Sequence, residues 1–282
     1  MRFDEFVDRA LYGQDGFYAS GRGAGRGRDF ITSPELGPLF GEVLATAVDG
    51  ARTIVEVGAG SGALRRSIES VLDVEYIEVE FADAMPDHVD GVILANELLD
   101  NLPFRLLERG PDGWLEVHVE DGAEVLQSID YAFDAPVGAR IPLQERAAAW
   151  VRQAAAAAPR VVAIDYCDTT QSMAIRPWTE WLRTYRAHGR GGHPLDQPGT
   201  QDITCEVAVD QLPAPTANTS QAEFLRAHGL DAIVEDARAA WRERAHIGDL
   251  EALKSRSRVH EADALTDPSG LGAFRVLEWV RD

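Results

Sequence analysis

The sequence contains a single lysine, Lys254, and is poor in basic residues as a whole. Of its 282 residues, 47 are Asp or Glu and 27 are Lys or Arg, which gives a formal net charge of -20. A chain this acidic repels the phosphate backbone of nucleic acids, so we expect no nucleic-acid partner.

Cysteine and long apolar runs are also scarce. Cys167 and Cys205 are the two cysteines, and their separation of 38 residues matches no zinc-binding spacing. We therefore expect no metal site and two reduced, buried thiols. No apolar run is long enough to cross a bilayer, and the first residues lack the apolar block of a signal peptide. These absences predict a cytoplasmic protein without a membrane partner.

The most informative segment is an apolar strand that runs into a glycine-rich turn. Thr53–Val57 is β-branched at four of five positions, which is typical of a strand buried on both faces. Gly58, Gly60 and Gly62 follow at alternate positions and let the backbone turn sharply and approach a ligand. A helix predicted from Leu64 completes the nucleotide-binding opening of a doubly wound α/β sheet.

Glu56 distinguishes the candidate ligands of this turn. As a dinucleotide fingerprint, the stretch would use Gly58, Gly60 and Ala63, but the carboxylate of Glu56 would repel a pyrophosphate. That carboxylate suits a cationic group such as the amino end of S-adenosylmethionine (SAM). The remaining interpretation is a turn that binds no ligand, with Glu56 exposed at a strand end. We favour SAM as the cofactor over NAD or FAD.

A second polar cluster, Asn96–Pro103, follows the predicted strand over residues 91–96. This position is the carboxyl edge, where open α/β sheets bind ligands. On a helical turn Glu97 and Asp100 would face the same way, and such a pair can bind a guanidinium through charge-assisted hydrogen bonds. The alternative is that Asn96 caps a helix and Glu97 lies in its first turn.

Glu80 and Asp83 are further candidates for cofactor binding. Glu80 lies 24 residues after Glu56 and 18 after Gly62. An acid about 20 residues past the turn commonly binds ribose hydroxyls. Asp83 could accept a hydrogen bond from an adenine amino group, although an ordinary loop carboxylate is an equal interpretation.

Periodicity predicts the remaining elements. Helices are expected near the N-terminus, from Ser33 towards Gly50, and over 142–158, 221–228 and 232–253. Strands are expected over 74–80, 160–166 and 274–280, with a hairpin formed by 104–109 and 114–119. The glycine- and arginine-rich run 21–28 is expected to be a mobile loop, and residues 168–202 an irregular segment.

Six collinear blocks carry a family resemblance: residues 10–18, 29–35, 56–62, 95–103, 198–204 and 270–274. They resemble the MidA-like SAM-dependent methyltransferases, whose mitochondrial members methylate an arginine during respiratory complex I assembly. The resemblance implies a class I methyltransferase core, a Rossmann-like doubly wound sheet, with an N-terminal helical extension and an inserted substrate-side segment. We place the extension at 1–50, the methyltransferase domain at 51–282 and the insertion at 168–225.

One stretch departs from the family pattern. Family members usually carry a full strand, helix and strand before the Asn–Glu segment, whereas here only about twenty residues lie between Leu72 and Gly91. We expect residues 74–80 to remain the strand beside the glycine turn, with Glu80 at its carboxyl end. If that strand were missing, Glu80 would lie away from the ribose.

The sequence therefore predicts a SAM-dependent methyltransferase acting on a protein arginine. Glu97 and Asp100 are the expected catalytic residues, and the expected cofactor-binding residues are Glu56, Gly58, Gly60, Gly62, Glu80, Asp83 and Asn96. The alternatives are a small-molecule methyltransferase, a non-catalytic SAM-binding assembly factor and an NAD-dependent dehydrogenase. The oligomeric state stays open, a homodimer included.

Overall fold

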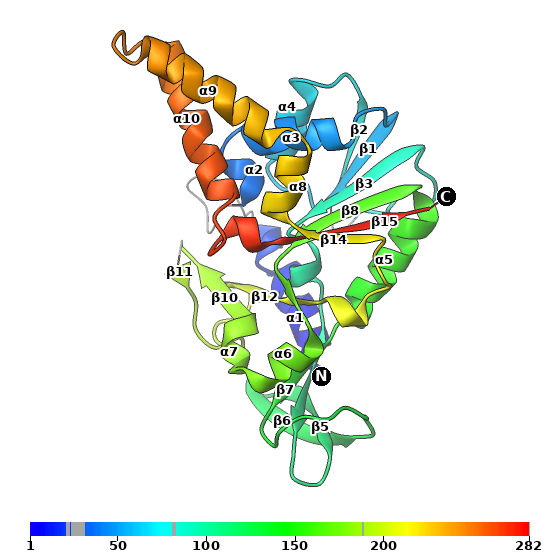
Figure 1. The fold of residues 1–282 in the computed structure, drawn as a ribbon. Helices are drawn as coiled ribbons and strands as arrows, with labels where there is room; N and C mark the ends of the chain where they lie inside the picture. The colour runs from blue at the N-terminus through cyan, green and yellow to red at the C-terminus, as the bar shows by residue number, and fades with distance from the viewer. Residues whose placement is uncertain (21–22, 24–31, 81–82, 188, 282) are drawn as a thin grey trace. The chain divides into compact units, whose positions relative to one another are not determined.

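The computed structural model describes residues 1–20, 23, 32–80, 83–187 and 189–281 (Figure 1). Except for Gly23, the expected loop 21–28 lies outside these residues, as do 29–31 of the second family block. The chain forms two compact units. One comprises Met1–Phe30, Glu97–Ala154 and Asp165–Pro215, and the other comprises Ile31–Asn96, Ala155–Ile164 and Thr216–Asp282. None of the boundaries between these segments falls at residue 50, and the expected extension over 1–50 is divided between the two units.

The second unit is built on a six-stranded sheet in the order β14-β15-β8-β3-β1-β2 (Figure 1). Its strands are β1 (Thr53–Val57), β2 (Glu75–Val79), β3 (Gly91–Asn96), β8 (Arg160–Asp165), β14 (Ala217–Ser220) and β15 (Arg275–Val280). β2, β1, β3 and β8 are parallel neighbours, whereas β14 and β15 pair antiparallel. The architecture is thus mixed α/β, and every residue of β1 is buried, as its β-branched sequence predicted.

The register of β1 fixes where a ligand can bind. Val57 pairs with Val79 of β2 on one side and with Ala95 of β3 on the other, so the three strands end together. The chain leaves β1 for β2 and then returns past β1 to β3. This reversal is a topological switch point, and its crevice at the carboxyl ends is the usual ligand site of open α/β sheets.

The shortened stretch keeps its strand and loses its helix. β2 spans Glu75–Val79 and pairs with β1, so the expected strand beside the glycine turn is confirmed. Residues 83–90, the described part of the connection to β3, contain no helix.

The helices of the second unit differ from expectation in two places. They are α2 (Ser33–Leu36), α3 (Leu39–Ala47), α4 (Ala63–Glu69), α8 (Gln221–Ala227), α9 (Leu230–Arg244) and α10 (Leu250–Leu265), with a short 3-10 turn, η4 (Leu271–Ala273). The single helix expected from Ser33 is wrong, because Gly37 and Pro38 break it into α2 and α3. The single helix expected over 232–253 is also wrong: α9 and α10 are separate helices that pack together, with Gly248 (φ 64°) between them.

The core of this unit lies between the sheet and helices α3 and α4. Phe40, Leu44, Ile54 and Ile68 are at most 1% exposed. Helices α3 and α4 approach closely at Gly41, where an added Cβ would lie 2.4 Å from the Cβ of Ser67. This packing fixes α4, the helix that follows the glycine turn.

The described residues of the first unit form three small sheets. The largest has the order β6-β5-β4-β7, and its β4 and β5 form the predicted hairpin. The helices of the first unit are α1 (Phe3–Tyr12), α5 (Glu145–Ala157, whose last turn belongs to the second unit), α6 (Thr170–Ile175) and α7 (Trp178–Trp181), with the 3-10 turns η1 (Tyr18–Ser20), η2 (Leu99–Asn101) and η3 (Val209–Gln211). Its strands are β4 (Arg105–Arg109), β5 (Trp114–Glu120), β6 (Ala123–Ile129), β7 (Arg140–Leu143), β9 (Cys167–Asp168), β10 (Leu182–Arg186), β11 (Gly189–Arg190), β12 (Asp202–Cys205) and β13 (Val207–Ala208). The segment expected to be irregular, 168–202, is therefore largely structured, and Pro142 lies in β7 rather than in a helix.

Aromatic packing holds the first unit together. Phe3, Phe17, Phe104 and Trp181 are at most 1% exposed and belong to one cluster. In the part of the chain that the structure describes, no helix is long and apolar enough to cross a membrane.

Candidate functional site

The glycine turn at the end of β1 has the geometry that its sequence requires. Gly58, Gly60 and Gly62 have φ values of 77°, 59° and 68°, in the left-handed region that favours glycine. The amide of Gly58 donates to the carbonyl of Val79 (2.8 Å), which ties the turn to β2. A Cβ built on Gly60 would meet no described atom closer than 4.0 Å. The turn therefore leaves open space beside Gly60, where a ligand can approach the backbone.

Glu56 is buried one residue before the end of β1. The residue is 4% exposed, and Oε2 of its carboxylate accepts a hydrogen bond from the hydroxyl of Tyr76 (2.7 Å). Burial, together with the nearby carboxylates of Glu78 and Glu80, raises the pKa of Glu56 to about 7, although the hydrogen bond from Tyr76 acts in the opposite direction. A cation near this carboxylate would lower its pKa again, so the site favours a positively charged ligand group.

Glu80 and Asp83 lie at the carboxyl end of β2. Oε1 of Glu80 accepts a hydrogen bond from the amide of Gly60 (3.0 Å), so the carboxylate reaches the glycine turn as predicted. Oδ2 of Asp83 accepts from the amide of Glu80 (3.0 Å), while the amide of Asp83 donates to the carbonyl of Glu80 (2.9 Å). In this structure Asp83 is thus hydrogen bonded to the backbone of Glu80 through both its side chain and its amide.

β3 leads from the second unit into the first. Asn96 is its last residue, and Glu97 follows with φ 51°, a left-handed conformation that is uncommon outside glycine. The 3-10 turn η2 starts only at Leu99, so Glu97 and Asp100 do not share one face of a helical turn.

Asp100 lies in a buried group of carboxylates in the first unit. It is 3% exposed, and its Oδ2 accepts a short hydrogen bond from the hydroxyl of Tyr166. Its Oδ1 is buried and accepts no hydrogen bond from any described residue. Asp165, at the end of β8, accepts from the amides of Leu99 (3.0 Å) and Asp100 (3.2 Å). Asp165 therefore fixes the backbone of η2.

A third carboxylate, Asp202, completes the group. Its Oδ1 accepts from the hydroxyl of Tyr18 (3.2 Å), from Nδ2 of Asn101 (3.0 Å) and from the amide of Ile203 (3.0 Å). The ring of Tyr12 stacks on that of Tyr18, with centroids 5.5 Å apart. The N-terminal segment thus supplies two tyrosines to the surroundings of Asp202.

Burial dominates the electrostatics of these acids. It raises the pKa of Asp202 to about 7, and the charge of Asp100 adds to the effect. It also raises the pKa of Asp100 and of Asp165, the latter further because of Asp100 and Glu97. Carboxyls with raised pKa values either hold protons at neutral pH or need a cationic partner.

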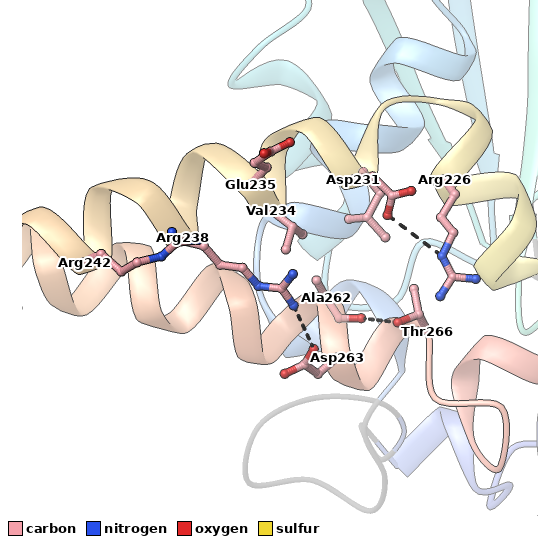
Figure 2. A pocket seen from close by; sticks show the side chains of 10 residues that line it. Arg226, Asp231, Val234, Glu235, Arg238, Arg242, Ala262, Asp263 and Thr266 are labelled. Carbon is pink, nitrogen blue, oxygen red and sulfur yellow. Dashed lines mark hydrogen bonds and ion pairs between the residues drawn. The ribbon is translucent and has the colours of Figure 1, made fainter.

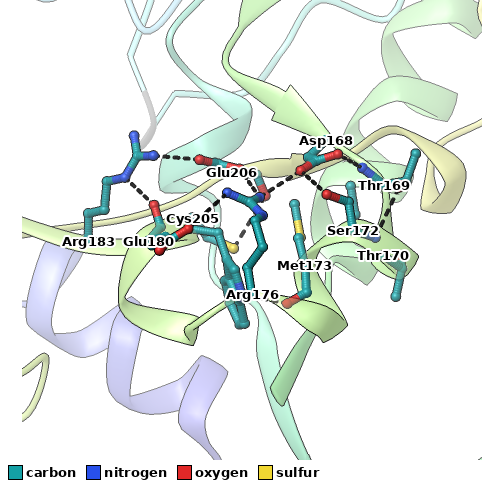
Figure 3. A network of polar contacts seen from close by, with 12 residues as sticks. Asp168, Thr169, Thr170, Ser172, Met173, Arg176, Glu180, Arg183, Cys205 and Glu206 are labelled. Carbon is teal, nitrogen blue, oxygen red and sulfur yellow. Dashed lines mark hydrogen bonds and ion pairs between the residues drawn. The ribbon is translucent and has the colours of Figure 1, made fainter. Parts of the chain in front are cut away.

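A salt-bridge network joins Arg176, Arg183 of β10 and Glu206 (Figure 3). Glu206 is 8% exposed and pairs with both Arg176 and Arg183. The guanidinium carbon of Arg183 lies 5.4 Å from the ring centroid of Tyr166, whose hydroxyl donates to Asp100. The network therefore fixes the Tyr166 ring that holds Asp100.

Sequence reasoning did not single out Asp165, Tyr166 or Tyr18 as site residues, and it included Asp202 only within one of the family blocks. Asp165 and Tyr166 end the strand β8, at the same carboxyl edge that drew attention to Asn96. Tyr18 and Asp202 lie in two of the family blocks, but they are 184 residues apart, and no local sequence pattern predicts the hydrogen bond between them. The strand-end position could have revealed Asp165.

Other candidate sites are weaker. A groove of about 490 Å³ lies between α9 and α10 (Figure 2). Four of its charged side chains form two ion pairs, Arg226 with Asp231 (3.9 Å) and Arg238 with Asp263 (4.0 Å), and these four are about half exposed or more. It is a solvated surface groove, and none of the predicted site residues lines it.

Among the described residues, no group of three His, Cys, Asp or Glu side chains could hold a metal ion. Both cysteines are free. Cys205 is buried as expected, whereas Cys167 is partly exposed.

Comparisons with known proteins give a consistent result. Residues 65–228 match the model of a family described as "Putative S-adenosyl-L-methionine-dependent methyltransferase". The search of curated proteins returned no match.

Two solved structures are similar over the whole chain. One is a crystal structure of a Burkholderia thailandensis protein bound to S-adenosyl-homocysteine, with a TM-score of 0.81 and 26% identity, covering 100% of this chain and 88% of that one. The other is a native crystal structure of an uncharacterized protein from the same organism. It has a TM-score of 0.78 and 26% identity, and covers 100% of this chain and 87% of that one.

Proposed function

Since the chain belongs to this family of S-adenosyl-L-methionine-dependent methyltransferases, we propose that it methylates an arginine guanidinium of a protein. SAM, the predicted cofactor, is the cofactor of the family, and the similar Burkholderia protein binds S-adenosyl-homocysteine, the product that SAM becomes after transfer. The acceptor is the part of the proposal that goes beyond the family.

The residues around the glycine turn fit SAM. The open space beside Gly60 admits a ligand against the backbone, and Glu80 lies at the turn with a second carboxylate oxygen for ribose hydroxyls. Glu56 would attract the amino group, and its raised pKa suits a carboxyl that ionises fully only beside a cation. Asp83 would orient Glu80, and Asn96 would contribute from the end of β3.

One observation carries the choice of a guanidinium as acceptor. Oδ1 of Asp100 is a buried carboxylate oxygen without a hydrogen-bond donor among the described residues, and Asp165 and Asp202 add buried acids to the same unit. A buried acceptor left without a donor costs free energy, and a guanidinium offers five N–H donors together with a positive charge. An arginine side chain would supply both the missing hydrogen-bond donor and a positive charge among the buried acids.

The chemistry follows from charge. Bound SAM would supply an electrophilic methyl group. Glu97 and Asp100 would hold the guanidinium in the orientation for in-line attack and stabilise the positive charge that its nitrogen gains. Because burial raises the pKa of Asp100, this carboxylate is also suited to accept the proton that the methylated nitrogen releases.

The finer classification is part of the same proposal. The order β2-β1-β3-β8, with antiparallel β14 and β15 at the far edge, supports a class I methyltransferase core. The six sequence blocks support the MidA-like group within the family. We propose that the enzyme acts in the cytoplasm on a protein substrate.

Transfer to candidate proteins, followed by mass spectrometry, tests the acceptor. The purified enzyme is incubated with SAM and with arginine-containing target proteins, and modified peptides are sequenced. The proposal expects mass increases of one methyl group, or multiples of it, on arginine. Methylation of carboxylates, cysteines or small molecules, with arginine unmodified, would exclude a guanidinium acceptor and leave the SAM-dependent transfer standing.

A further inference from the structure

A short helix outside the strand–turn–helix motif contacts the glycine turn. The hydroxyl of Ser61, in the middle of the turn, donates a short hydrogen bond to Oε1 of Glu35 in α2. Both side chains are partly buried. The carbonyl of Ser61 accepts from Nη1 of Arg66 (2.7 Å). The residue between Gly60 and Gly62 is therefore held through its side chain by α2 and through its backbone by α4.

Helix α2 is itself rigidly anchored within the second unit. Ser33, which is fully buried, donates to Oε1 of Gln221 (3.1 Å), and Nε2 of Gln221 donates to the carbonyl of Leu265 (3.0 Å). Two helices of the C-terminal half, α8 and α10, thus fix the start of α2.

The end of α2 is fixed by a second contact from α10. The carboxylate of Glu261 accepts from the amide of Leu39 (3.2 Å) and from the hydroxyl of Ser257 (3.1 Å). It lies so close to Gly37 that an added Cβ there would be 2.2 Å from its carboxyl carbon. Glu35 therefore lies on a segment that is held at both ends. Because this segment is fixed, the Glu35 carboxylate is already in place at the turn before a ligand binds there.

We propose that Glu35 is a positioning residue of the cofactor site. It acts through Ser61, by holding the turn in the conformation that receives SAM, and it need not touch the cofactor. The inference rests on the proposed function because it assigns Glu35 to the SAM site. The turn is then held by two acids from different elements, Glu80 at the amide of Gly60 and Glu35 at the hydroxyl of Ser61.

A double-mutant cycle with SAM titrated calorimetrically tests this role. Glu35→Ala and Ser61→Ala should each weaken SAM binding about tenfold, since each removes the same charge-assisted hydrogen bond. The double variant should bind no more weakly than the worse single variant, because the interaction is already absent. Glu35→Gln, which keeps an acceptor oxygen of the same reach, should recover part of the affinity.

Controls separate positioning from general stability. Glu42→Gln on α3 makes the same charge change at an acid that pairs with Arg258, and it should leave SAM binding unchanged. Thermal unfolding without ligand should be similar for Glu35→Gln and for the wild type. Wild-type affinity in Glu35→Ala, or losses that multiply to about a hundredfold in the double variant, would overturn the inference. Failure of the wild type to bind SAM would instead overturn the proposed function.

Discussion

At the scale of single residues, burial decides what each carboxyl can do. Glu56 is buried and lies near the carboxylates of Glu78 and Glu80, so its pKa rises to about 7 even though Tyr76 donates a hydrogen bond to it. Glu80 is exposed, and its carboxylate meets the backbone of the turn. We therefore propose different roles for these two acids: Glu56 would attract a cationic group, and Glu80 would provide hydrogen-bond acceptors.

The first prediction concerns Glu56. Glu56→Gln should weaken the binding of SAM more than that of S-adenosyl compounds without the amino group, since only SAM loses a charge partner. Calorimetric titration of both ligands measures the difference. An equal loss for both ligands would remove Glu56 from the recognition of the amino group.

The second prediction concerns Glu97. Glu97→Gln should lower turnover on an arginine-containing target and leave SAM affinity nearly unchanged, because the lost charge acts on the acceptor. By analogy with oxyanion-hole deletions, the loss should be about 2.7–4 kcal/mol of transition-state stabilisation. Steady-state kinetics with a fixed target protein give the turnover, and titration gives the affinity. A drop in SAM affinity with unchanged turnover would place Glu97 at the cofactor instead.

At the scale of elements, the strand β1, the glycine turn and α4 form the motif at which we propose that the cofactor binds. Local sequence was sufficient to predict it, because β-branched residues, glycines and the following helix are all encoded within seventeen residues, 53–69. The register with β2 and β3 then brings Glu80 to the same edge.

The third prediction tests the turn. Gly60→Val should abolish SAM binding, because the side chain would fill the open space beside the backbone. Gly122→Val is the matched control: Gly122 has a similar φ of 76°, also faces open space, and lies in a β-hairpin of the other unit. Both variants should lose comparable thermal stability, and calorimetry should show SAM binding only in the control. Retained SAM binding in Gly60→Val would contradict the placement of the ligand.

Elements held by distant contacts were less predictable. The Ser33–Gly50 helix was expected to be continuous, but α2 ends at Leu36, and Glu261, more than two hundred residues later, packs against Gly37. The buried acids likewise depend on long-range contacts, since Tyr18 reaches Asp202. Periodicity reports on neighbours along the chain and carries no signal for such pairs.

At the scale of the whole molecule, buried acids couple stability to pH. In the ligand-free protein the free energy of unfolding should fall as the pH rises from about 4.5 to about 7 because of Glu56, and from about 3.8 because of Asp202. Their pKa values are about 7 when folded, against ordinary values of 4.5 and 3.8, so the folded chain binds more protons in this window.

The fourth prediction follows from this coupling. The free energy of unfolding of Asp202→Asn should depend less steeply on pH than that of the wild type. The two slopes should differ by up to about 1.4 kcal/mol per pH unit. Urea unfolding at a series of pH values between about 5 and about 7 measures both slopes. Identical slopes, or a wild-type contribution of opposite sign, would show that the carboxyl of Asp202 is ionised in the folded protein.

The central claim is that this acidic α/β protein binds SAM at the carboxyl edge of β1. Isothermal titration of the wild-type protein with SAM and, separately, with NADH tests it most directly. The account predicts saturable binding of SAM and no binding of NADH, because Glu56 favours a cation and repels a pyrophosphate. Binding of NADH without binding of SAM would contradict it.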